Sequence, residues 1–354
     1  MRFRIIIICL LLSAFYTSDS KAVVILQYHH VSDSTPSSTS ISVEQFTLHM
    51  NYLKEQEFKV LPLDTIIEGL KQGEEFDQKT VAITFDDGYL DILSNADPVL
   101  QELEFPYSIF ITPENTRDES STNLSWPQLN AMSENNVLIL NHSFEHLHLN
   151  RQNENETVKE WKHRIKNDII QAQILIDENI ATQPKYLAYP YGEYNTQLLE
   201  LVKSMGYVAF GQHSGALSPK SDFTSLPRFT VSGRYANLET LKVKLQTMVM
   251  PITKLVNNNP QLDQHTSGNI KRPKLTATLD LSDIYKPTLA CYILGEKVEP
   301  TWINNTTFSI ESSVDLPAGR SRYNCTAQSR TSFGYYWFSQ PWISRKEDGE
   351  WAKG

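Results

Sequence analysis

Two adjacent aspartates at the end of an apolar segment are the first residues of this sequence whose chemistry needs an explanation. Asp86 and Asp87 follow the segment Thr80–Phe85 and precede Gly88. Neighbouring carboxylates repel each other, and a bound cation removes that repulsion because it favours both ionised forms. Taken alone, an Asp-Asp-Gly sequence is more typical of a turn. The pair therefore needs a second group before it indicates a site.

That second group is a histidine pair, His142 and His146, in the sequence Asn-His-Ser-Phe-Glu-His. If the segment begins a helix, a spacing of four places both imidazoles on one face. A His-x-x-x-His pair alone is more often an exposed helix face. Two imidazoles and one carboxylate, however, form a facial site for a divalent cation and leave positions for water and substrate. We therefore predict that Asp87, His142 and His146 hold the cation, while Asp86 accepts a proton from the bound water.

The segments around these residues predict how the two groups come together. Seven short apolar segments alternate with amphipathic segments of helical spacing, and they span residues 23–30, 58–63, 80–85, 106–112, 136–140, 185–191 and 207–212. Apolar strands that alternate with helices predict a parallel sheet covered by helices. Seven such repeats predict a distorted (β/α)7 TIM-like barrel over residues 23–250, with the carboxyl ends of its strands at one mouth. Both groups would then face a shared site.

These two segments resemble the first two motifs of the polysaccharide deacetylases, the NodB-homology domain of carbohydrate esterase family 4. The resemblance covers about residues 23–232 and rests on Thr-Phe-Asp-Asp-Gly at 84–88 and His-Ser-Phe-Glu-His at 142–146. It implies a divalent metal, with zinc expected, that activates water to remove an N-acetyl group from a sugar polymer. By position, Asp86 would be the base and the other three residues the metal ligands. Tyr191 matches the third motif, whose tyrosine backbone N–H helps to stabilise the oxyanion.

The sequence departs from the family pattern at two positions. Many members have an arginine that orients the catalytic aspartate at the position of Ala188, and we expect Arg228 to replace it, with a purely structural salt bridge as the alternative. The histidine that supplies the general acid is also missing after residue 215. His213 is the candidate donor, although it could simply cap its loop, and His29 and His30 are the competing candidates that would line the mouth.

The N-terminal residues 1–22 read as a secretory signal. Arg2 and Arg4 precede an apolar run from Ile5 to Leu12, and a small residue, Ala22, ends the segment. This pattern is typical of a cleaved signal peptide, because the apolar run is too short for a membrane anchor, which is the alternative reading. We expect an exported protein, periplasmic, at the cell surface or extracellular, with no transmembrane span after signal removal. The net charge of −9 argues against nucleic acid as a partner.

The composition and the apolar pattern of the chain change after residue 250. Residues 251–273 are rich in Asn, Gln, Pro and Ser and predict a linker, and residues 274–345 predict a small all-β domain. Cys291 and Cys325 are expected to form a disulfide in an exported protein. Together with Trp302 and Tyr323 they resemble the core of an immunoglobulin-like sandwich. The aromatic residues near 335–342 would either stack on sugar rings or form the core of that domain.

The sequence thus predicts a metal-dependent hydrolase that removes N-acetyl groups from an acetylated polysaccharide containing N-acetylglucosamine. The segments Tyr-His-His-Val-Ser at 28–32 and Tyr-Pro-Tyr-Gly-Glu-Tyr-Asn at 189–195 resemble the family branch that acts on extracellular poly-N-acetylglucosamine. An O-acetyl esterase, another amide hydrolase of the same fold and a non-catalytic glycan-binding protein are the alternatives.

Overall fold

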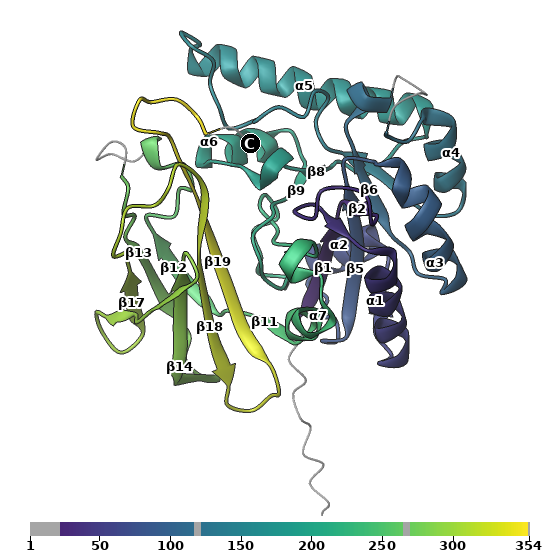
Figure 1. The fold of residues 1–354 in the computed structure, drawn as a ribbon. Coiled ribbons are helices and arrows are strands. Elements are labelled where there is room, and N and C mark those ends of the chain that lie inside the picture. The colour runs from purple at the N-terminus through teal and green to yellow at the C-terminus, as the bar shows by residue number, and fades with distance from the viewer. Residues whose placement is uncertain (1–21, 117–121, 265–269, 353–354) are drawn as a thin grey trace, which may run out of the picture.

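The structure is a computed structural model that describes residues 22–116, 122–264 and 270–352. Figure 1 shows two regions side by side, an α/β region (residues 22–245) and a β region (residues 247–344). The predicted signal peptide lies outside the described residues except for Ala22, which is buried at the start of the first strand. No helix within the described ranges combines the length and the apolar character needed to span a bilayer.

The α/β region is built on one curved parallel sheet. Its strands follow the order β10-β1-β5-β6-β7-β8-β9, with bounds β1 Val23–Tyr28, β5 Thr80–Asp86, β6 Ser108–Ile111, β7 Leu138–Asn141, β8 Tyr186–Ala188, β9 Val208–Phe210 and β10 Phe229–Thr230. The edge strands β9 and β10 are joined through the segment between them, because the Leu226 N–H donates to the Ala209 carbonyl at 2.8 Å and the Gly211 N–H donates to the Leu226 carbonyl at 2.9 Å. The result is a half-barrel of parallel strands.

Seven helices accompany this sheet. They are α1 Val43–Glu55, α2 Leu63–Lys71, α3 Asp97–Glu102, α4 Trp126–Glu134, α5 Val158–Asn179, α6 Thr196–Ser204 and α7 Leu238–Leu245. The apolar residues of α1, α3, α4 and α7 form one core cluster with one face of the sheet. Residues of α2, such as Ile66, instead share a cluster with Ile25 and Ala82 on the opposite face. That face therefore becomes the barrel interior, which α2 helps to fill.

One predicted strand of the barrel is much shorter than expected and lies off the main path, and one strand was missed. The segment 58–63 contributes only β4, Lys59–Val60, which pairs with the start of β5 and lies off the main path of the sheet. The remaining position in the sheet belongs to β10, which pairs with β1. A two-residue strand is too short to produce a recognisable alternation of apolar residues. A further small pair, β2 His30–Val31 and β3 Ser40–Ile41, follows β1.

The β region contains two sheets around one apolar core. The five-stranded sheet has the order β11-β19-β18-β14-β15 and the four-stranded sheet the order β12-β13-β17-β16, with bounds β11 Thr247–Val249, β12 Ile252–Val256, β13 Leu275–Leu279, β14 Ile284–Ile293, β15 Glu296–Val298, β16 Thr301–Trp302, β17 Thr307–Ile310, β18 Gly319–Ser329 and β19 Tyr335–Ser344. The linker predicted for 251–273 is therefore wrong over β12, which pairs with β13. Because β12 is short and flanked by Asn and Pro, its alternation is hidden in the composition.

The predicted disulfide is present, but its place in the fold differs from the immunoglobulin pattern. Cys291 and Cys325 are bonded, and they are paired residues on the neighbouring strands β14 and β18 of one sheet. In the immunoglobulin core the disulfide links the two sheets. Trp302 lies on β16 in the other sheet. The expectation of an immunoglobulin-type core is therefore wrong for the disulfide, and the all-β character is what remains.

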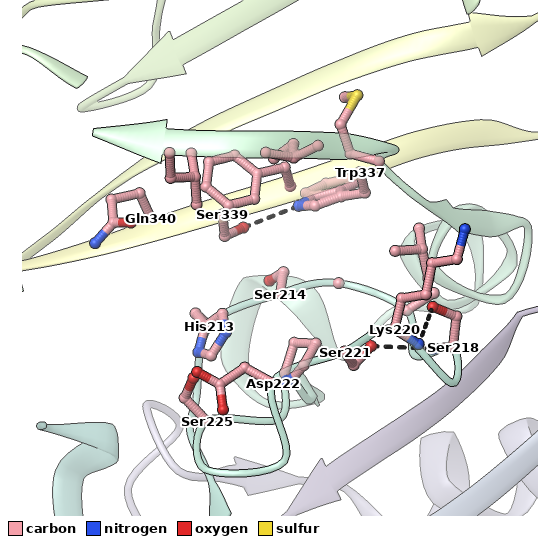
Figure 2. A pocket seen from close by; sticks show the side chains of 18 of the residues that line it. His213, Ser214, Ser218, Lys220, Ser221, Asp222, Ser225, Trp337, Ser339 and Gln340 are labelled. Carbon is pink, nitrogen blue, oxygen red and sulfur yellow. Dashed lines mark hydrogen bonds between the residues drawn. The ribbon is translucent and has the colours of Figure 1, made fainter. Parts of the chain in front are cut away.

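The two regions contact each other through β11 and β19. Trp337 on β19 packs edge to face against Phe229 of β10, with ring centroids 5.6 Å apart. Beside this contact lies a cleft of about 740 Å³ between β19 and the loop after β9 (Figure 2). Figure 2 places Trp337 on one wall of the cleft and His213 and Asp222 on the other. Part of the predicted aromatic cluster thus serves as an interface between regions.

Candidate active site

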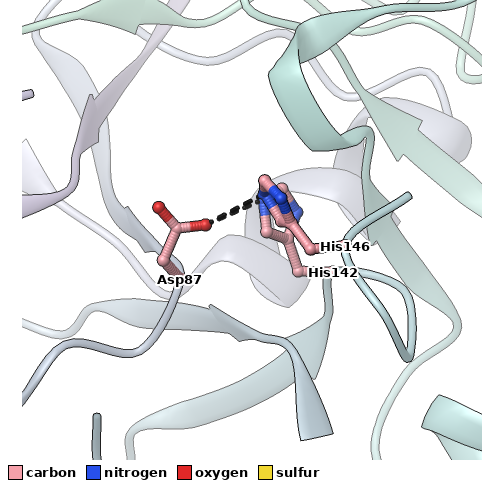
Figure 3. A group of neighbouring side chains, drawn as sticks. All are labelled: Asp87, His142 and His146. Atoms are coloured by element: carbon pink, nitrogen blue, oxygen red, sulfur yellow. Dashed lines mark ion pairs between the residues drawn. The ribbon is translucent and has the colours of Figure 1, made fainter. Parts of the chain in front are cut away.

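Asp87, His142 and His146 come together at the carboxyl ends of β5 and β7 (Figure 3). The Nε2 atom of His142 lies 3.3 Å from Asp87 Oδ1, and the Nε2 atom of His146 lies 3.2 Å from the same oxygen. One ligand atom from each residue falls within 4.8 Å of the other two. This spacing suits three donors that converge on one cation.

The second imidazole nitrogen of His142 supports the same conclusion. His142 Nδ1 donates to the carbonyl oxygen of Ala188 at 2.8 Å, so Nε2, which points to Asp87, is the nitrogen that would bind a metal once it has lost its proton. A backbone partner of this kind fixes the tautomer and the ring orientation of metal-binding histidines. Two imidazole nitrogens and one carboxylate oxygen are the donor set that zinc uses. The residues present therefore fit a divalent metal.

The loop that carries the two histidines is not the helix that their spacing suggested. Residues 142–146 have no helical structure, and Ser143 and His146 adopt φ angles of 66° and 56°. Asp87 and Tyr191 share this left-handed conformation, with φ angles of 70° and 60°. Non-glycine residues in this region carry strain, and such residues cluster at functional sites. The imidazoles meet because the loop folds back, and the expectation of a shared helix face is wrong.

Two buried side chains that the sequence reasoning missed hold this loop. Asp168 on α5 accepts the backbone N–H groups of Phe144 and Glu145, each at 3.1 Å. Asn141 Oδ1 accepts the backbone N–H of Ser143 at 2.9 Å. Burial raises the pKa of Asp168, although the two N–H donors oppose that rise. A carboxylate on the apolar face of an amphipathic helix was the signal that could have identified Asp168.

Asp86 lies beside the metal ligands, in a fully buried polar cluster. Arg228 contacts both of its oxygens, with Nη1 donating to Oδ1 and Nη2 donating to Oδ2 at 2.7 Å each. Gln27 donates from Nε2 to Oδ2 at 2.6 Å. Asp86, Arg228 and Gln27 are each 0% exposed. Gln27 was also missed, and its signal was a lone polar residue within the apolar strand β1.

The alternation of strand residues explains why this cluster faces the barrel interior. Ile25 and Ala82 belong to the interior core, and Gln27 and Asp86 continue the same faces of β1 and β5. Arg228 reaches them from the segment that joins β9 and β10, where its Nε donates to the Gly211 carbonyl at 3.0 Å. The expected arginine contact is therefore present, although it arrives from another strand end than in the family pattern.

Charge in the cluster keeps both aspartates ionised. Burial alone would raise the pKa of Asp86, but Arg228 and His142 outweigh burial and hold that pKa below its usual value. Burial acts in the same direction on Asp87, and hydrogen bonds from His142 and His146 lower the pKa of Asp87 well below its ordinary value. Asp86 Oδ1 accepts a single side-chain hydrogen bond, from Arg228. A carboxylate oxygen accepts two, so Oδ1 keeps a lone pair that can take a proton.

Tyr191 forms the rim next to the candidate metal ligands. Its ring stacks on His148 with centroids 3.8 Å apart and meets the ring of His146 edge to face at 4.6 Å. The next buried carboxylate, Glu193, pairs with His148 at 2.8 Å and Arg151 at 3.1 Å. Burial alone would raise the pKa of Glu193, but the contacts with His148 and Arg151 outweigh burial and hold that pKa below its ordinary value. Tyr191 thus lies beside His146, and its role as the third-motif tyrosine stays a prediction.

His29 and His30 diverge at the end of β1. His29 is 9% exposed, its Nδ1 atom has no hydrogen-bond partner among the described residues, and its electrostatic neighbours include Asp86, Asp87 and His142. Burial lowers the pKa of His29, and the two aspartates oppose that effect. His30 turns away, because its Nδ1 lies 2.6 Å from Asp91 and its ring stacks on Tyr89. Of the two, His29 is the residue that faces the acidic pair.

His213 has different surroundings. It lines the cleft of Figure 2, which Asp87, His142 and His146 do not line. Burial lowers the pKa of His213 to about 3, and its charged neighbours, Arg322 and Arg228, lower it further. An imidazole with this pKa carries no proton to donate near neutral pH. The contacts of His213 therefore give no support to its predicted role as general acid. His29 differs from it by its place beside Asp86 and Asp87, which oppose the effect of burial on its pKa.

Comparison with known proteins gives the same family as the motifs. The polysaccharide deacetylase family model matches residues 73–210, which include the aspartate pair, the two histidines and Tyr191. A putative polysaccharide deacetylase of Bacillus subtilis, YxkH, is 27% identical over 209 residues, covering 59% of this chain and 71% of that protein. The poly-β-1,6-N-acetyl-D-glucosamine N-deacetylase of Staphylococcus aureus (strain MSSA476) is 28% identical over 198 residues, covering 54% and 68%.

Solved structures agree with the α/β architecture. The Streptococcus pyogenes deacetylase PplD, in complex with acetate, matches with a TM-score of 0.57 at 20% identity over 64% of this chain and 99% of that chain. IcaB from Ammonifex degensii matches with a TM-score of 0.56 at 19% identity over 64% and 98%. These likenesses establish the fold, and the motif residues and the family model establish the relationship. The chain therefore contains a polysaccharide deacetylase domain, matched over residues 73–210.

Proposed function

We propose that this protein is a metal-dependent N-deacetylase of an N-acetylglucosamine-containing polysaccharide. The observation that carries the proposal is the convergence of Asp87, His142 and His146 within 4.8 Å, next to the buried pair of Asp86 and Arg228. The relative in Staphylococcus aureus is named for N-deacetylation of poly-β-1,6-N-acetyl-D-glucosamine. The reaction adds water across the amide, breaks its C–N bond and yields acetate and a free amine.

Each residue of the site has a distinct task in this reaction. A divalent metal, with zinc expected, would lower the pKa of a water molecule and polarise the acetyl carbonyl. Asp86 takes the proton of that water at Oδ1, while Arg228 and Gln27 fix its orientation. The backbone N–H of Tyr191 donates to the oxygen on which negative charge develops, a role taken from the third family motif.

We assign proton delivery to His29. Breaking the C–N bond needs a proton on the departing nitrogen, because an amine anion is a poor leaving group. His29 lies among Asp86, Asp87 and His142, and its Nδ1 atom has no hydrogen-bond partner in the described part of the chain. His30, by contrast, is engaged by Asp91 and Tyr89 and has a positioning role at most.

We also propose that the protein acts outside the cytoplasm. The signal-like sequence of residues 1–22 supports export to the periplasm, the cell surface or the medium. Acetylated polymers of the cell envelope or matrix are found in these places, so the substrate would be met there. The β region, which starts at Thr247, would travel with the catalytic α/β region as one polypeptide.

Acetate release from a panel of acetylated glycans tests the function. We expect release from N-acetylglucosamine polymers, loss of release after chelation, and recovery when zinc is returned. His142→Ala should lose both bound metal and activity, whereas His163→Ala, an exposed histidine on α5, should keep both. Equal metal content in the two variants would refute the metal assignment. Release from O-acetylated glycans alone would refute the N-deacetylase assignment.

A further inference from the structure

Strand β18 of the β region reaches the rim of the active site. Arg320 on β18 donates from Nη1 to the backbone carbonyl of Tyr191 at 2.9 Å. Its guanidinium carbon also lies 5.6 Å from the centre of the Tyr191 ring. Arg322 projects from the same face of the strand, two residues along, and donates to the Gln212 carbonyl at 3.4 Å. The β region therefore contacts two loops at the carboxyl ends of β8 and β9.

Tyr191 is a residue that needs such support. Its backbone has a φ of 60° and a ψ of 1°, a conformation that costs a non-glycine residue roughly 1–3 kcal/mol unless its surroundings impose it. The aromatic contacts to His148 and His146 hold the ring. In the peptide group after Tyr191, the Gly192 N–H donates to the Tyr189 carbonyl at 2.8 Å, and the Tyr191 carbonyl is left to a partner outside the turn. The hydrogen bond from Arg320 acts directly on that peptide group.

We propose that Arg320 is a positioning residue for the hydrolytic reaction, and that the β region is thereby a working part of the active site. Arg320 holds the Tyr191 carbonyl and so restrains ψ of Tyr191. The Tyr191 N–H belongs to the preceding peptide group, whose Pro190 carbonyl accepts the Glu193 N–H at 3.2 Å, so Arg320 acts on the N–H direction by closing the same short turn from its other end. The ring of Tyr191 packs against the ring of His146, so a fixed Tyr191 also restricts the position of His146. The kinetic part of the inference rests on the proposed function, whereas the constraint on the loop does not.

The expected consequence is a loss of kcat with little change in stability. Removing one oxyanion donor costs about 10²- to 10³-fold in kcat. Arg320→Ala releases the loop, which misplaces the Tyr191 N–H without deleting it. We therefore expect a roughly tenfold lower kcat and a nearly unchanged KM in this variant. The side chain of Arg320 is 46% exposed, so its removal leaves no buried cavity. The metal content should stay at the wild-type value.

Three variants separate positioning from a general effect of the β region. Arg320→Ala removes the donor, and Arg320→Lys keeps a cationic donor that can reach the carbonyl and should restore part of kcat. Arg272→Ala is the matched control. Arg272 is also an exposed arginine of the β region, but its ion-pair partner is Asp315 and not a residue of the rim loops. Each full-length variant is measured for kcat, KM, melting temperature and metal content. The substrate is an N-acetylglucosamine oligomer that the wild type deacetylates.

Hydrogen exchange gives a readout that needs no substrate. Peptides that cover residues 186–194 should exchange faster in Arg320→Ala than in the wild type or Arg272→Ala, because the loop loses a tether. If the wild type is active and Arg320→Ala matches Arg272→Ala in kcat and exchange, the positioning role is overturned and the proposed function stands. If the wild type releases no acetate from any glycan, the proposed function fails, and exchange alone decides whether Arg320 holds the loop.

Discussion

Two arginine–carboxylate pairs flank the candidate site, and they differ in almost every physical respect. Arg228 and Asp86 are both 0% exposed and share two hydrogen bonds of 2.7 Å in a bidentate arrangement. Arg320 and Glu193 approach to only 4.0 Å, and the arginine side chain is 46% exposed while the carboxylate is 2% exposed. The first pair belongs to the barrel interior, whereas the second joins two regions of the molecule at the rim.

The difference shows how one site can combine rigid and adjustable parts. A buried bidentate pair has no water to replace a lost partner, so the rest of the barrel must be built around it. A half-exposed arginine gives up little solvation and contributes little stability. The carboxylate that we propose as the proton acceptor is therefore held by the interior, and the loop that we propose to orient the oxyanion donor is held at the rim.

The largest expected effect follows from breaking the interior pair. Arg228→Met should cost about 3–5 kcal/mol of unfolding free energy, because it leaves Asp86 charged, buried and without its main partner. Turnover should fall to background, since Asp86 also loses its orientation. Urea unfolding and acetate release measure the two effects.

The double variant Arg228→Met with Asp86→Asn is the control for this prediction. It removes the uncompensated charge, so it should regain much of the lost stability while it remains inactive. Equal stability of the single and the double variant would show that Arg228 acts through packing rather than through its charge.

The proton donor comes next in size. We expect His29→Ala to lower kcat by about 10²- to 10⁴-fold and to flatten the alkaline limb of the pH–rate profile, because that limb reports deprotonation of a general acid. Since the pKa of His29 is lowered by burial, the limb should lie below the ordinary pKa of histidine. His213→Ala should leave the limb in place, since a group with a pKa of about 3 is already neutral throughout that range. Profiles of kcat for both variants, with metal content measured alongside, check this prediction. A flattened limb in His213→Ala alone would return the role to that residue.

Local patterns predicted the interior half of the site better than the rim. Asp86 and Asp87 are adjacent in sequence at the end of an apolar strand, and His142 and His146 follow another, so their meeting needed only the parallel order of the strands. Arg228 was identified only as the replacement for a missing family residue. The two-residue strand next to it, β10, has too few residues to show a periodic pattern.

The rim could not be predicted because it depends on contacts between distant segments. Arg320 is 129 residues from Tyr191 in sequence, and nothing near it distinguishes it from any exposed arginine on a strand. The β region includes β11 and β12, which pair with β19 and β13 but had been assigned to the barrel end and to a linker. Because these short strands were not recognised, no pattern in the sequence indicated that the two regions share an interface.

The smallest expected effect is the coupling free energy of the rim pair. In a double-mutant cycle of Arg320→Ala and Glu193→Gln, the coupling in unfolding free energy should stay below about 1 kcal/mol, as for exposed ion pairs. The physical reason is that Glu193 keeps His148 and Arg151 when Arg320 is removed, so its charge is never left unpaired.

The same cycle separates the stability of the rim from its effect on rate. Urea unfolding supplies the four free energies, and kcat is measured on the same proteins. If Arg320 acts through the Tyr191 carbonyl, kcat falls in Arg320→Ala even where the coupling to Glu193 is close to zero, because the two contacts are made by different atoms of the guanidinium. A coupling of about 3 kcal/mol or more, the range of buried pairs, would contradict the distinction between interior and rim. It would mean that the β region is fixed to the barrel as firmly as Arg228 is fixed to Asp86.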